Sequence, residues 1–534
     1  MKMVKSLILG SAAGIVAMSG AQAADLPVKA KAVEYVRICS LYGAGFFYIP
    51  GTDTCIKLGG FIRVDVVAGS NSDDTAPTSP PGSTYNRFAN AYTWRSREDM
   101  QFDTRTATEY GVVRTFSEVV FSWTDDTSNP SGTNALGTVY SQIGSTGFGQ
   151  ANNGSSGLGT AGALGVYYAF IQFAGFTMGK AVSPFSSSFV NYPGNNFDGL
   201  VGGGGAVTGV NQFIYTAQFG NGVSGTIGVQ DPTQYYQAGV NNFGVFGTPN
   251  ATGVNDQSGS LVPDIVGNIM VTQAWGNAQL SAAAHDNTPG YYANGGTLSS
   301  TGGAGIPAAL NSQLGGHPDS RWGWAIQGSL SLNTPQTGAG DVLNIQGVYT
   351  SGATRYNIQD LAAGNGAWQG YNNNGVPGTL GGVGLGVAPD AVFNFGGQLQ
   401  LIQTWGGRGG FTHNWNPYWS TSIYGAYAEV SYGSVTSTGS AAAIYCASFL
   451  ASQAAAGNTA LTCNPNYNIS QAGIITRWTP VKNLTFSADF TYQHLGQNMT
   501  GVGVIGLTNA QPGGLYTFSN LDTYQVLLRA QRNF

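Results

Sequence analysis

The last stretch of the chain, residues 521–534, constrains the fold more than any other. Its side chains alternate between apolar and polar, apart from Leu527 and Arg532. The apolar set is Tyr524, Val526, Leu528, Ala530 and Phe534, and the polar set is Thr523, Gln525, Arg529, Gln531 and Asn533. A period of two predicts a β-strand with one apolar face, and about ten residues of tilted strand cross a bilayer. A membrane sheet must leave no backbone group unpaired, so we expect the last strand to pair with the first in a closed barrel.

The N-terminus has the pattern of an export signal. Lys2 and Lys5 precede an apolar run over residues 7–18, and Ala21-Gln22-Ala23 forms a small-residue cleavage pattern. We therefore expect residues 1–23 to be a signal peptide that is removed after Ala23. The alternative, a membrane-anchoring helix, is disfavoured because the run is too short to span a bilayer.

The composition favours two protein classes. Only 8% of residues are charged, 12% are aromatic and 81 are glycine, as in outer-membrane barrels and in secreted polar repeat proteins. No repeat of 20–50 residues is visible, which argues against the repeat protein. Without Lys2 and Lys5 the chain holds 18 basic and 25 acidic side chains, a net charge of −7. This acidic balance argues against a nucleic-acid partner.

Alternation predicts about sixteen strands, and therefore an all-β, antiparallel transmembrane barrel over residues 57–534. Short and long connections alternate between them, which is the signature of outer-membrane barrels. Residues 392–415 are ambiguous between one bent strand and two. The candidates are residues 57–69, 87–103, 110–123, 163–173, 176–182, 213–219, 223–229, 265–275, 278–286, 321–332, 342–356, 398–415, 418–432, 468–478, 484–493 and 521–534.

One candidate strand carries a row of charges that must face water. Arg95, Arg97, Asp99, Gln101 and Asp103 share a face. A basic side chain at the bilayer midplane costs about 2–4 kcal/mol and an acidic one somewhat less, so this face is expected to line the barrel interior.

Cysteines and histidines give little sign of catalytic or metal chemistry. Cys39/Cys55 and Cys446/Cys463 form two close pairs, which in an exported chain predict two local disulfides rather than a metal site. The histidines, His285, His317, His413 and His494, are scattered without metal spacing and are interpreted as lone polar residues. No Gly-x-Ser-x-Gly nucleophile elbow occurs. Together, these cysteine, histidine and serine patterns predict no metal, no cofactor and no enzymatic activity.

Several segments resemble a known family, the alphaproteobacterial porins of the Brucella and Rhizobium type. They are residues 34–39 (EYVRIC), 42–55, 58–63 (LGGFIR), 169–180 and 413–417 (HNWNP), and the terminal Phe534. The resemblance implies a sixteen-stranded homotrimeric porin of the outer membrane that lets small hydrophilic solutes and ions diffuse passively. It also implies that Cys39 and Cys55 pair within an N-terminal segment (residues 24–56) on the periplasmic side, and that the barrel-assembly machinery reads Phe534.

Residues 183–210 have neither strand nor helix periodicity, and we expect them to fold inward and narrow the lumen. The resemblance likewise implies an inward third loop. Asp198 is the only charge in this stretch. Facing it we expect Arg63, Arg95, Arg97 and Arg114, with Arg477 and Arg529 across the seam, so that a transverse field orders water and polar solutes. The alternative is that Asp65, Asp99, Asp103 and Glu118 neutralise these arginines in wall pairs.

Other functions and surfaces follow from weaker patterns. A substrate-specific outer-membrane channel would need an aromatic ladder in the lumen. A barrel enzyme would need a Ser/His/acid set. An adhesin is supported only by the long loops. Small outward residues such as Thr115 and Ser117 suit a subunit interface. Aromatic residues near strand ends are interpreted as an interfacial girdle: Trp322, Trp324, Tyr424, Tyr432 and Trp478.

Overall fold

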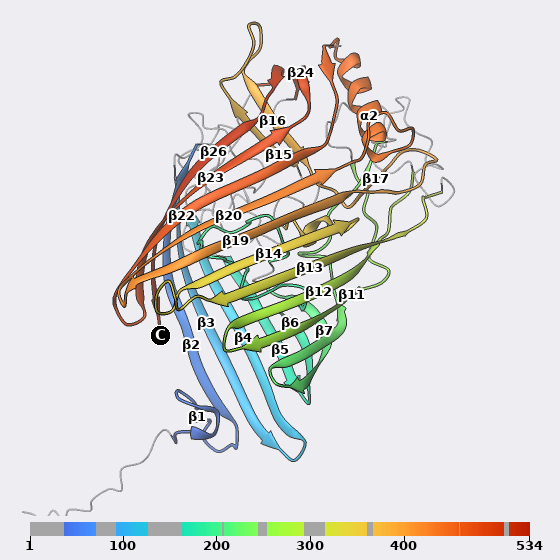
Figure 1. Cartoon of the computed structure of the whole chain (residues 1–534). Helices are drawn as coiled ribbons and strands as arrows, with labels where there is room; N and C mark the ends of the chain where they lie inside the picture. The colour runs from blue at the N-terminus through green and yellow to red at the C-terminus, as the bar shows by residue number, and fades with distance from the viewer. Residues whose placement is uncertain are drawn as a thin grey trace, which may run out of the picture.

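The computed structural model describes residues 37–70, 92–125, 163–205, 208–243, 254–292, 316–359, 367–458, 460–506 and 512–534. Its main body is a closed antiparallel barrel (Figure 1). The sixteen barrel strands are β2 (Cys55–Gly69), β3 (Thr93–Thr108), β4 (Gly111–Asp125), β5 (Ala163–Phe173), β6 (Phe176–Ala181), β7 (Val210–Gly220), β8 (Val223–Gln230), β11 (Asp264–Gln273), β12 (Gly276–Asn287), β13 (Arg321–Asn333), β14 (Val342–Ser351), β19 (Gln403–Asn416), β20 (Trp419–Ser431), β22 (Tyr467–Val481), β23 (Leu484–Gln497) and β26 (Leu521–Asn533). None of the described helices has the length and hydropathy to cross a membrane.

The seam between β2 and β26 closes the barrel, as the terminal alternation predicts. The two strands pair from Phe61 opposite Asn533 to Gly69 opposite Gln525. Tyr524 and Leu528 on the apolar face are each 51% exposed, whereas Gln525 on the polar face is 1% exposed. The first and last spanning strands therefore satisfy each other's backbone groups.

Leu527, the apolar exception on the polar face of β26, has a packing partner inside the barrel. It is fully buried in a small cluster with Val67 of β2 and Phe197. Phe197 belongs to the connection between β6 and β7, so an apolar residue in the lumen-facing row marks where this connection touches the wall.

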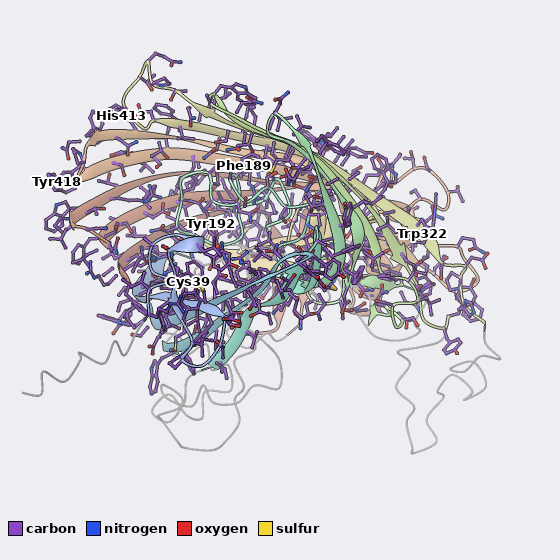
Figure 2. The ribbon with its side chains drawn as sticks, turned by 90° about the horizontal axis from the view of Figure 1, so that it is seen from below. Cys39, Phe189, Tyr192, Trp322, His413 and Tyr418 are labelled. Atoms are coloured by element: carbon purple, nitrogen blue, oxygen red, sulfur yellow. A yellow bond between two sulfur atoms is a disulfide. The ribbon has the colours of Figure 1, made fainter. Side chains whose placement is uncertain are left out.

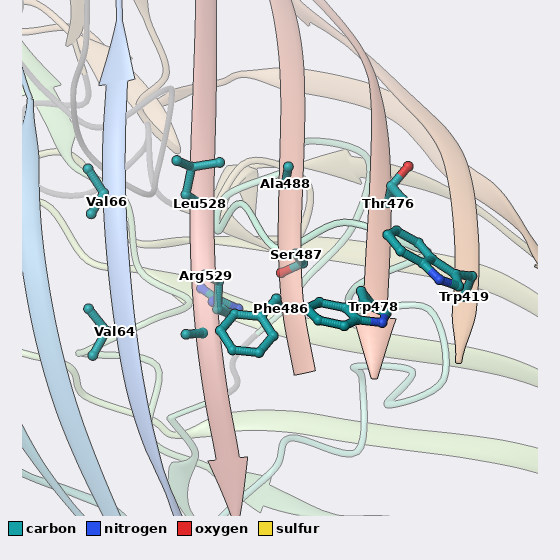
Figure 3. Close-up of a pocket in the computed structure, with 11 residues that line it drawn as sticks. Val64, Val66, Trp419, Thr476, Trp478, Phe486, Ser487, Ala488, Leu528 and Arg529 are labelled. Carbon is teal, nitrogen blue, oxygen red and sulfur yellow. The ribbon is translucent and has the colours of Figure 1, made fainter. Parts of the chain in front are cut away.

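The outer wall near the seam is smooth and apolar. Figure 3 shows a shallow depression there, lined by Val64 and Val66 of β2, Leu528 of β26 and Ala488 of β23. Trp478 also lines it and stacks with Trp419 on one side and Phe486 on the other, with ring centroids 5.9 and 5.6 Å apart. Small aliphatic side chains bordered by rings suit lipid tails and an interfacial aromatic girdle.

The girdle interpretation is right for the tryptophans and wrong for two tyrosines. Trp322, Trp324 and Trp478 are 41–47% exposed on the outer surface. Tyr424 and Tyr432 are instead 6% and 3% exposed and point inward, where their hydroxyls donate to Asp489 and to the Val387 carbonyl.

The N-terminal segment lies at the lower end of the barrel (Figure 1). It holds the 3-10 helix η1 (Ser40–Tyr42) and the short strand β1 (Phe47–Tyr48), which pairs with the start of β2. The predicted Cys39–Cys55 disulfide is present, with both cysteines 1% exposed and packed against Phe46. The disulfide ties this segment directly to the first barrel strand.

The upper end carries folded structure in place of the predicted plain loops (Figure 1). Residues 392–415 divide into three strands rather than one or two, and residues 342–356 end as a strand at Ser351. The elements at this end are two small sheets, a 3-10 helix and an α-helix: β9 (Val240–Asn242), β10 (Val254–Asn255), β17 (Ala391–Phe393) and β18 (Gln400–Leu401); β15 (Ala367–Asn372), β16 (Gly382–Val387), β21 (Leu461–Thr462), β24 (Thr500–Ile505) and β25 (Gly514–Phe518); η4 (Thr354–Tyr356); and α2 (Ala441–Ala455).

An apolar core holds this upper region together. Tyr445 and Phe449 of α2 are fully buried with Trp368, Tyr467 and other large side chains from barrel strands and small sheets. The predicted Cys446–Cys463 disulfide is present and joins α2 to the segment before β22. The long connections therefore form a compact cap over part of the barrel.

Candidate pore constriction

The connection between β6 and β7, here called the inner loop (residues 182–209, of which 206 and 207 are not described), lies inside the barrel. Figure 2 looks along the barrel from below and shows Phe189 and Tyr192 of this loop within the ring of strands. The loop follows the wall strand by strand. Its polar contacts around the wall include Ser183 Oγ to Gln230 at 2.6 Å (β8), Ser187 Oγ to Ser329 at 2.6 Å (β13), the amide of Val201 to Gln471 at 2.9 Å (β22) and the amide of Asn196 to Asp489 at 2.6 Å (β23).

Arg408 of β19 anchors two separate parts of the inner loop to the wall. Its guanidinium donates to the carbonyls of Leu200 and Gly204 at 3.1 and 3.2 Å, and to Asn191 Oδ1 at 3.3 Å. The side chain is 6% exposed. Hydrogen bonds from a charged donor are worth about 1.5–3 kcal/mol each, so Arg408 fixes two parts of the loop to one strand.

Glycines let the inner loop approach the wall at backbone distance. Gly202 has φ +92°, and a Cβ there would collide with the backbone of Gly407 on β19. A Cβ at Gly410 would press on the Pro193 carbonyl. The Gly-Gly-Arg-Gly-Gly run of β19 therefore combines two roles: its arginine binds the loop and its glycines make room for it.

The part of the wall formed by β2, β3 and β26 is basic. Arg95 of β3 and Arg529 of β26 both contact Asp65 of β2, at 2.7 and 2.6 Å. Arg63 donates to Gln531 at 2.8 Å and Arg97 to Ser122 Oγ at 3.0 Å. Among the described residues neither Arg63 nor Arg97 forms an ion pair with a carboxylate.

Asp198 of the inner loop faces this basic wall. It accepts a 2.6 Å hydrogen bond from the Tyr192 hydroxyl. Burial by itself would raise the pKa of Asp198, but Arg95, the Tyr192 hydroxyl, Arg97 and Arg529 outweigh it and hold the pKa below its usual value. The carboxylate is therefore ionised opposite several guanidinium groups.

The remaining predicted arginines have other partners. Arg114 of β4 pairs with Asp103 at 3.0 Å and donates to Gln172 at 2.9 Å, as in the alternative of wall pairs. Arg477 of β22 donates to the Gly194 carbonyl at 2.5 Å and to Ser422 at 2.9 Å, so it anchors the inner loop. Of the predicted set, the structure brings Arg63, Arg95, Arg97 and Arg529 together near Asp198.

Sequence reasoning missed Arg408, Tyr192 and Asp489. Arg408 lies between two glycine pairs, which is a signal of close backbone approach. Asp489 occupies the inward face of the most regular alternating strand, and its carboxylate receives the amide of Asn196. Tyr192 gives no sequence signal, because its role depends on where the loop docks.

The histidines also differ from their interpretation as lone residues. His285 is fully buried between Asp264 and Asp390, with nitrogen–oxygen distances of 2.8 and 3.4 Å. His413 and His494 pair with Asp341 and Asp522. Within the described ranges, no group of three or more His, Cys, Asp or Glu side chains could hold a metal ion.

Known proteins share both the sequence pattern and the fold. The sequence model described as "Porin subfamily" matches residues 25–522. Porin Omp2b of Brucella suis and of Brucella abortus are each 34% identical over 277 residues, 51% of this chain and 64% of those relatives' length. The channel DcaP of Acinetobacter baumannii superposes with a TM-score of 0.53 at 15% identity, over 91% of this chain and 99% of that chain, which supports the barrel fold alone.

Because the subfamily match covers most of the chain and the strands close into a sixteen-stranded barrel, this protein belongs to the porin subfamily and spans the bacterial outer membrane with its strands.

Proposed function

We propose that this protein forms a water-filled channel through which small hydrophilic solutes and ions diffuse passively across the outer membrane. The observation that carries the proposal is the inner loop, which is bonded to the lumen wall within a closed sixteen-stranded barrel. Barrels of this size enclose an aqueous channel. A loop folded against one side of the wall narrows that channel and leaves the rest of its cross-section open.

The constriction lies between Asp198 and the basic wall formed by Arg63, Arg95, Arg97 and Arg529. Two of these guanidinium groups, those of Arg63 and Arg97, form no ion pair with a carboxylate among the described residues, although Asp99 and Glu118 lie on the same part of the wall. The field across the gap orders water and polar solutes and favours anions over cations of the same size.

Planar-bilayer recording of the purified full-length protein tests the channel directly. Discrete conductance steps that grow linearly with salt concentration are expected, and large neutral polymers are expected to be excluded. A correctly folded preparation that leaves the bilayer silent would overturn the proposal.

Neutralising Arg63 and Arg97 together, by R63Q and R97Q, is expected to shift selectivity toward cations. These two lack carboxylate partners among the described residues, so their removal takes two net positive charges from the gap. The reversal potential in a salt gradient measures the shift. R321Q at the upper end of β13 serves as the control, and an equal reversal potential in all three proteins would contradict the assignment.

The working unit is proposed to be a homotrimer that associates through the outer face of β3 and β4. Ser96, Glu98 and Thr115 are exposed there, where other outer-wall positions hold residues such as Ile269 and Leu280. A carboxylate facing lipid is costly, so this patch requires a cover. E98L is expected to leave the barrel folded and to change the oligomer distribution on non-denaturing gels.

Export and assembly complete the proposal. Residues 1–23, outside the described residues, act as the signal peptide, residues 24–56 form the periplasmic segment, and the barrel-assembly machinery recognises Phe534. Phe534 is 61% exposed at the lower end, and its amide donates to the Gly60 carbonyl at 3.1 Å.

A further inference from the structure

A cavity of ≈ 410 Å³ opens inside the barrel beside the base of the inner loop. Val182 and Pro184 of the inner loop border it, and the barrel wall from β4 round to β11 supplies the rest. Asn268 of β11 lines the cavity and donates to the Pro184 carbonyl of the inner loop, and its cross-strand partner Thr226 lines it too, so the cavity belongs to the lumen and not to the lipid face. Its size suits a solute of one ring and a few substituents.

One wall of this cavity is aromatic, and we call it the aromatic shelf: Phe116 of β4 with Tyr168 and Phe170 of β5. The Phe116 and Phe170 rings stack with centroids 5.4 Å apart, and Tyr168 lies 6.2 Å from Phe116. All three side chains are only partly buried, in contrast to the fully buried rings of the upper cap. Ring surface is therefore left open toward the water-filled lumen.

The edge of the shelf carries a positive charge. The Arg114 guanidinium lies 5.1 and 5.5 Å from the ring centroids of Phe116 and Phe170. Arg114 and Arg105 both pair with Asp103, at 3.0 and 2.9 Å, so two cations share one carboxylate and one positive charge remains. The Arg114 side chain is 28% exposed, so it can still reach an anion in the lumen.

The remaining lining is polar and uncharged. Thr216 and Thr226 bond each other at 3.0 Å, and Gln172 donates to Thr177 at 3.1 Å. Asn268 donates to the Pro184 carbonyl at 2.6 Å. These groups satisfy one another and place no acid in the cavity, so nothing in its lining repels an anion.

We propose that the aromatic shelf and Arg114 form a solute-binding subsite for small anions that carry a flat apolar ring, such as aromatic carboxylates. The ring stacks on Phe116 and Phe170 and the carboxylate binds Arg114. The inference rests on the proposed channel function and gives it a preferred substrate class. Binding must be weak, because a site in a conducting pore has to release its solute.

Ion-current recording with benzoate as the probe tests the subsite in the full-length protein. Benzoate is expected to reduce the potassium chloride current and raise its noise in a saturable way. Acetate, which has the charge without the ring, and benzamide, which has the ring without the charge, are expected to do neither. Equal effects of benzoate and acetate would overturn the subsite while leaving the channel intact.

Two variants test whether benzoate binds at the aromatic shelf and Arg114. R114Q and, separately, F170L are expected to raise the half-blocking benzoate concentration about ten-fold, the ratio that loss of one such contact produces. F213L on the outer face of β7 is the matched control and is expected to match the unchanged protein. If R114Q does not fold, F170L decides alone. Saturable block that neither variant weakens would place the site elsewhere and overturn the inference, whereas a silent bilayer would overturn the channel itself.

Discussion

Replacing Arg408 with alanine is expected to raise the single-channel conductance and admit larger solutes. The change removes the donors that hold the Leu200 and Gly204 carbonyls and Asn191 against β19. Each such bond is worth about 1.5–3 kcal/mol, a large share of what fixes a loop rich in glycine. A sixteen-stranded barrel is wide once nothing narrows it, so mean conductance is expected to rise roughly two-fold.

A second variant reaches the same loop without touching a charge. G202V places a branched side chain at φ +92° and against the backbone of Gly407, so the loop cannot lie flat on β19. It is expected to raise conductance as R408A does, while leaving the reversal potential closer to that of the unchanged protein.

R321A removes one hydrogen bond to the Leu399 carbonyl, 3.1 Å away at the upper end of the barrel, and is expected to leave conductance unchanged. If R408A and G202V both fold, as judged by heat-modifiable migration on gels, and both conduct like the unchanged protein, the inner loop does not limit the current.

The barrel itself could be predicted from the sequence because its signals are local. Alternation in residues 521–534 identified the lipid face of β26, and the tight turn between β7 and β8 holds Asn221-Gly222, a pair typical of hairpins. The exception at Leu527 needs the whole fold. Its place in the strand turns it toward the lumen, and an apolar side chain fits there because Phe197 of the inner loop packs against it, a contact between residues more than three hundred positions apart.

The upper cap could not be predicted for a related reason. Tyr424 and Tyr432 lie where β20 runs along the packed interior, so inward positions there are apolar and the rule that separates lipid face from lumen fails. Helix α2 has buried side chains on several sides and therefore no clear helical stripe. Its one local signal was Ser440, whose side chain accepts the amide of Ala443 as an N-cap before an alanine-rich run.

The constriction was predictable in residue type but not in pairing. Arg63, Arg95 and Arg97 follow from the charged row and its partner strand. Side-chain contacts decide which of these arginines pair with a carboxylate. Asp65 forms ion pairs with Arg95 and Arg529, whereas Arg63 and Arg97 donate hydrogen bonds to neutral groups.

Replacing His285 with alanine is expected to cause the largest loss of stability of any single histidine change. Both ring nitrogens face carboxylate oxygens: Nδ1 is hydrogen-bonded to Asp264 at 2.8 Å, and Nε2 lies 3.4 Å from Asp390 in an ion-pair contact, the arrangement expected of an imidazolium. All three side chains are fully buried. Removing the imidazolium leaves the two buried carboxylates without a cationic partner. Breaking a buried ion pair in this way lowers the free energy of unfolding by about 3–5 kcal/mol.

H285A is also expected to destabilise the inner loop and the upper cap, because both contact the triad of His285, Asp264 and Asp390. Asp390 also accepts the amides of Ala238 and Thr354, at 2.6 and 2.5 Å. Asp264 accepts the hydroxyl of Tyr356, whose ring lies 4.6 Å from that of Phe185 at the base of the inner loop. H285A should therefore unfold at lower denaturant concentration and expose the cap to protease.

H494A is the matched control, since His494 pairs with Asp522 at 2.7 Å but with side chains 30% and 50% exposed. An exposed pair of this kind contributes about 0–1 kcal/mol. Denaturant unfolding in detergent micelles, followed by tryptophan fluorescence, compares the variants. The double change H285A/D264N removes one of the two unpaired carboxylates and keeps an oxygen that accepts from the Tyr356 hydroxyl. It is expected to recover part of the loss, because residues in one network are coupled. Equal midpoints for H285A and H494A, or no recovery in the double variant, would show that the buried triad does not hold the cap to the barrel.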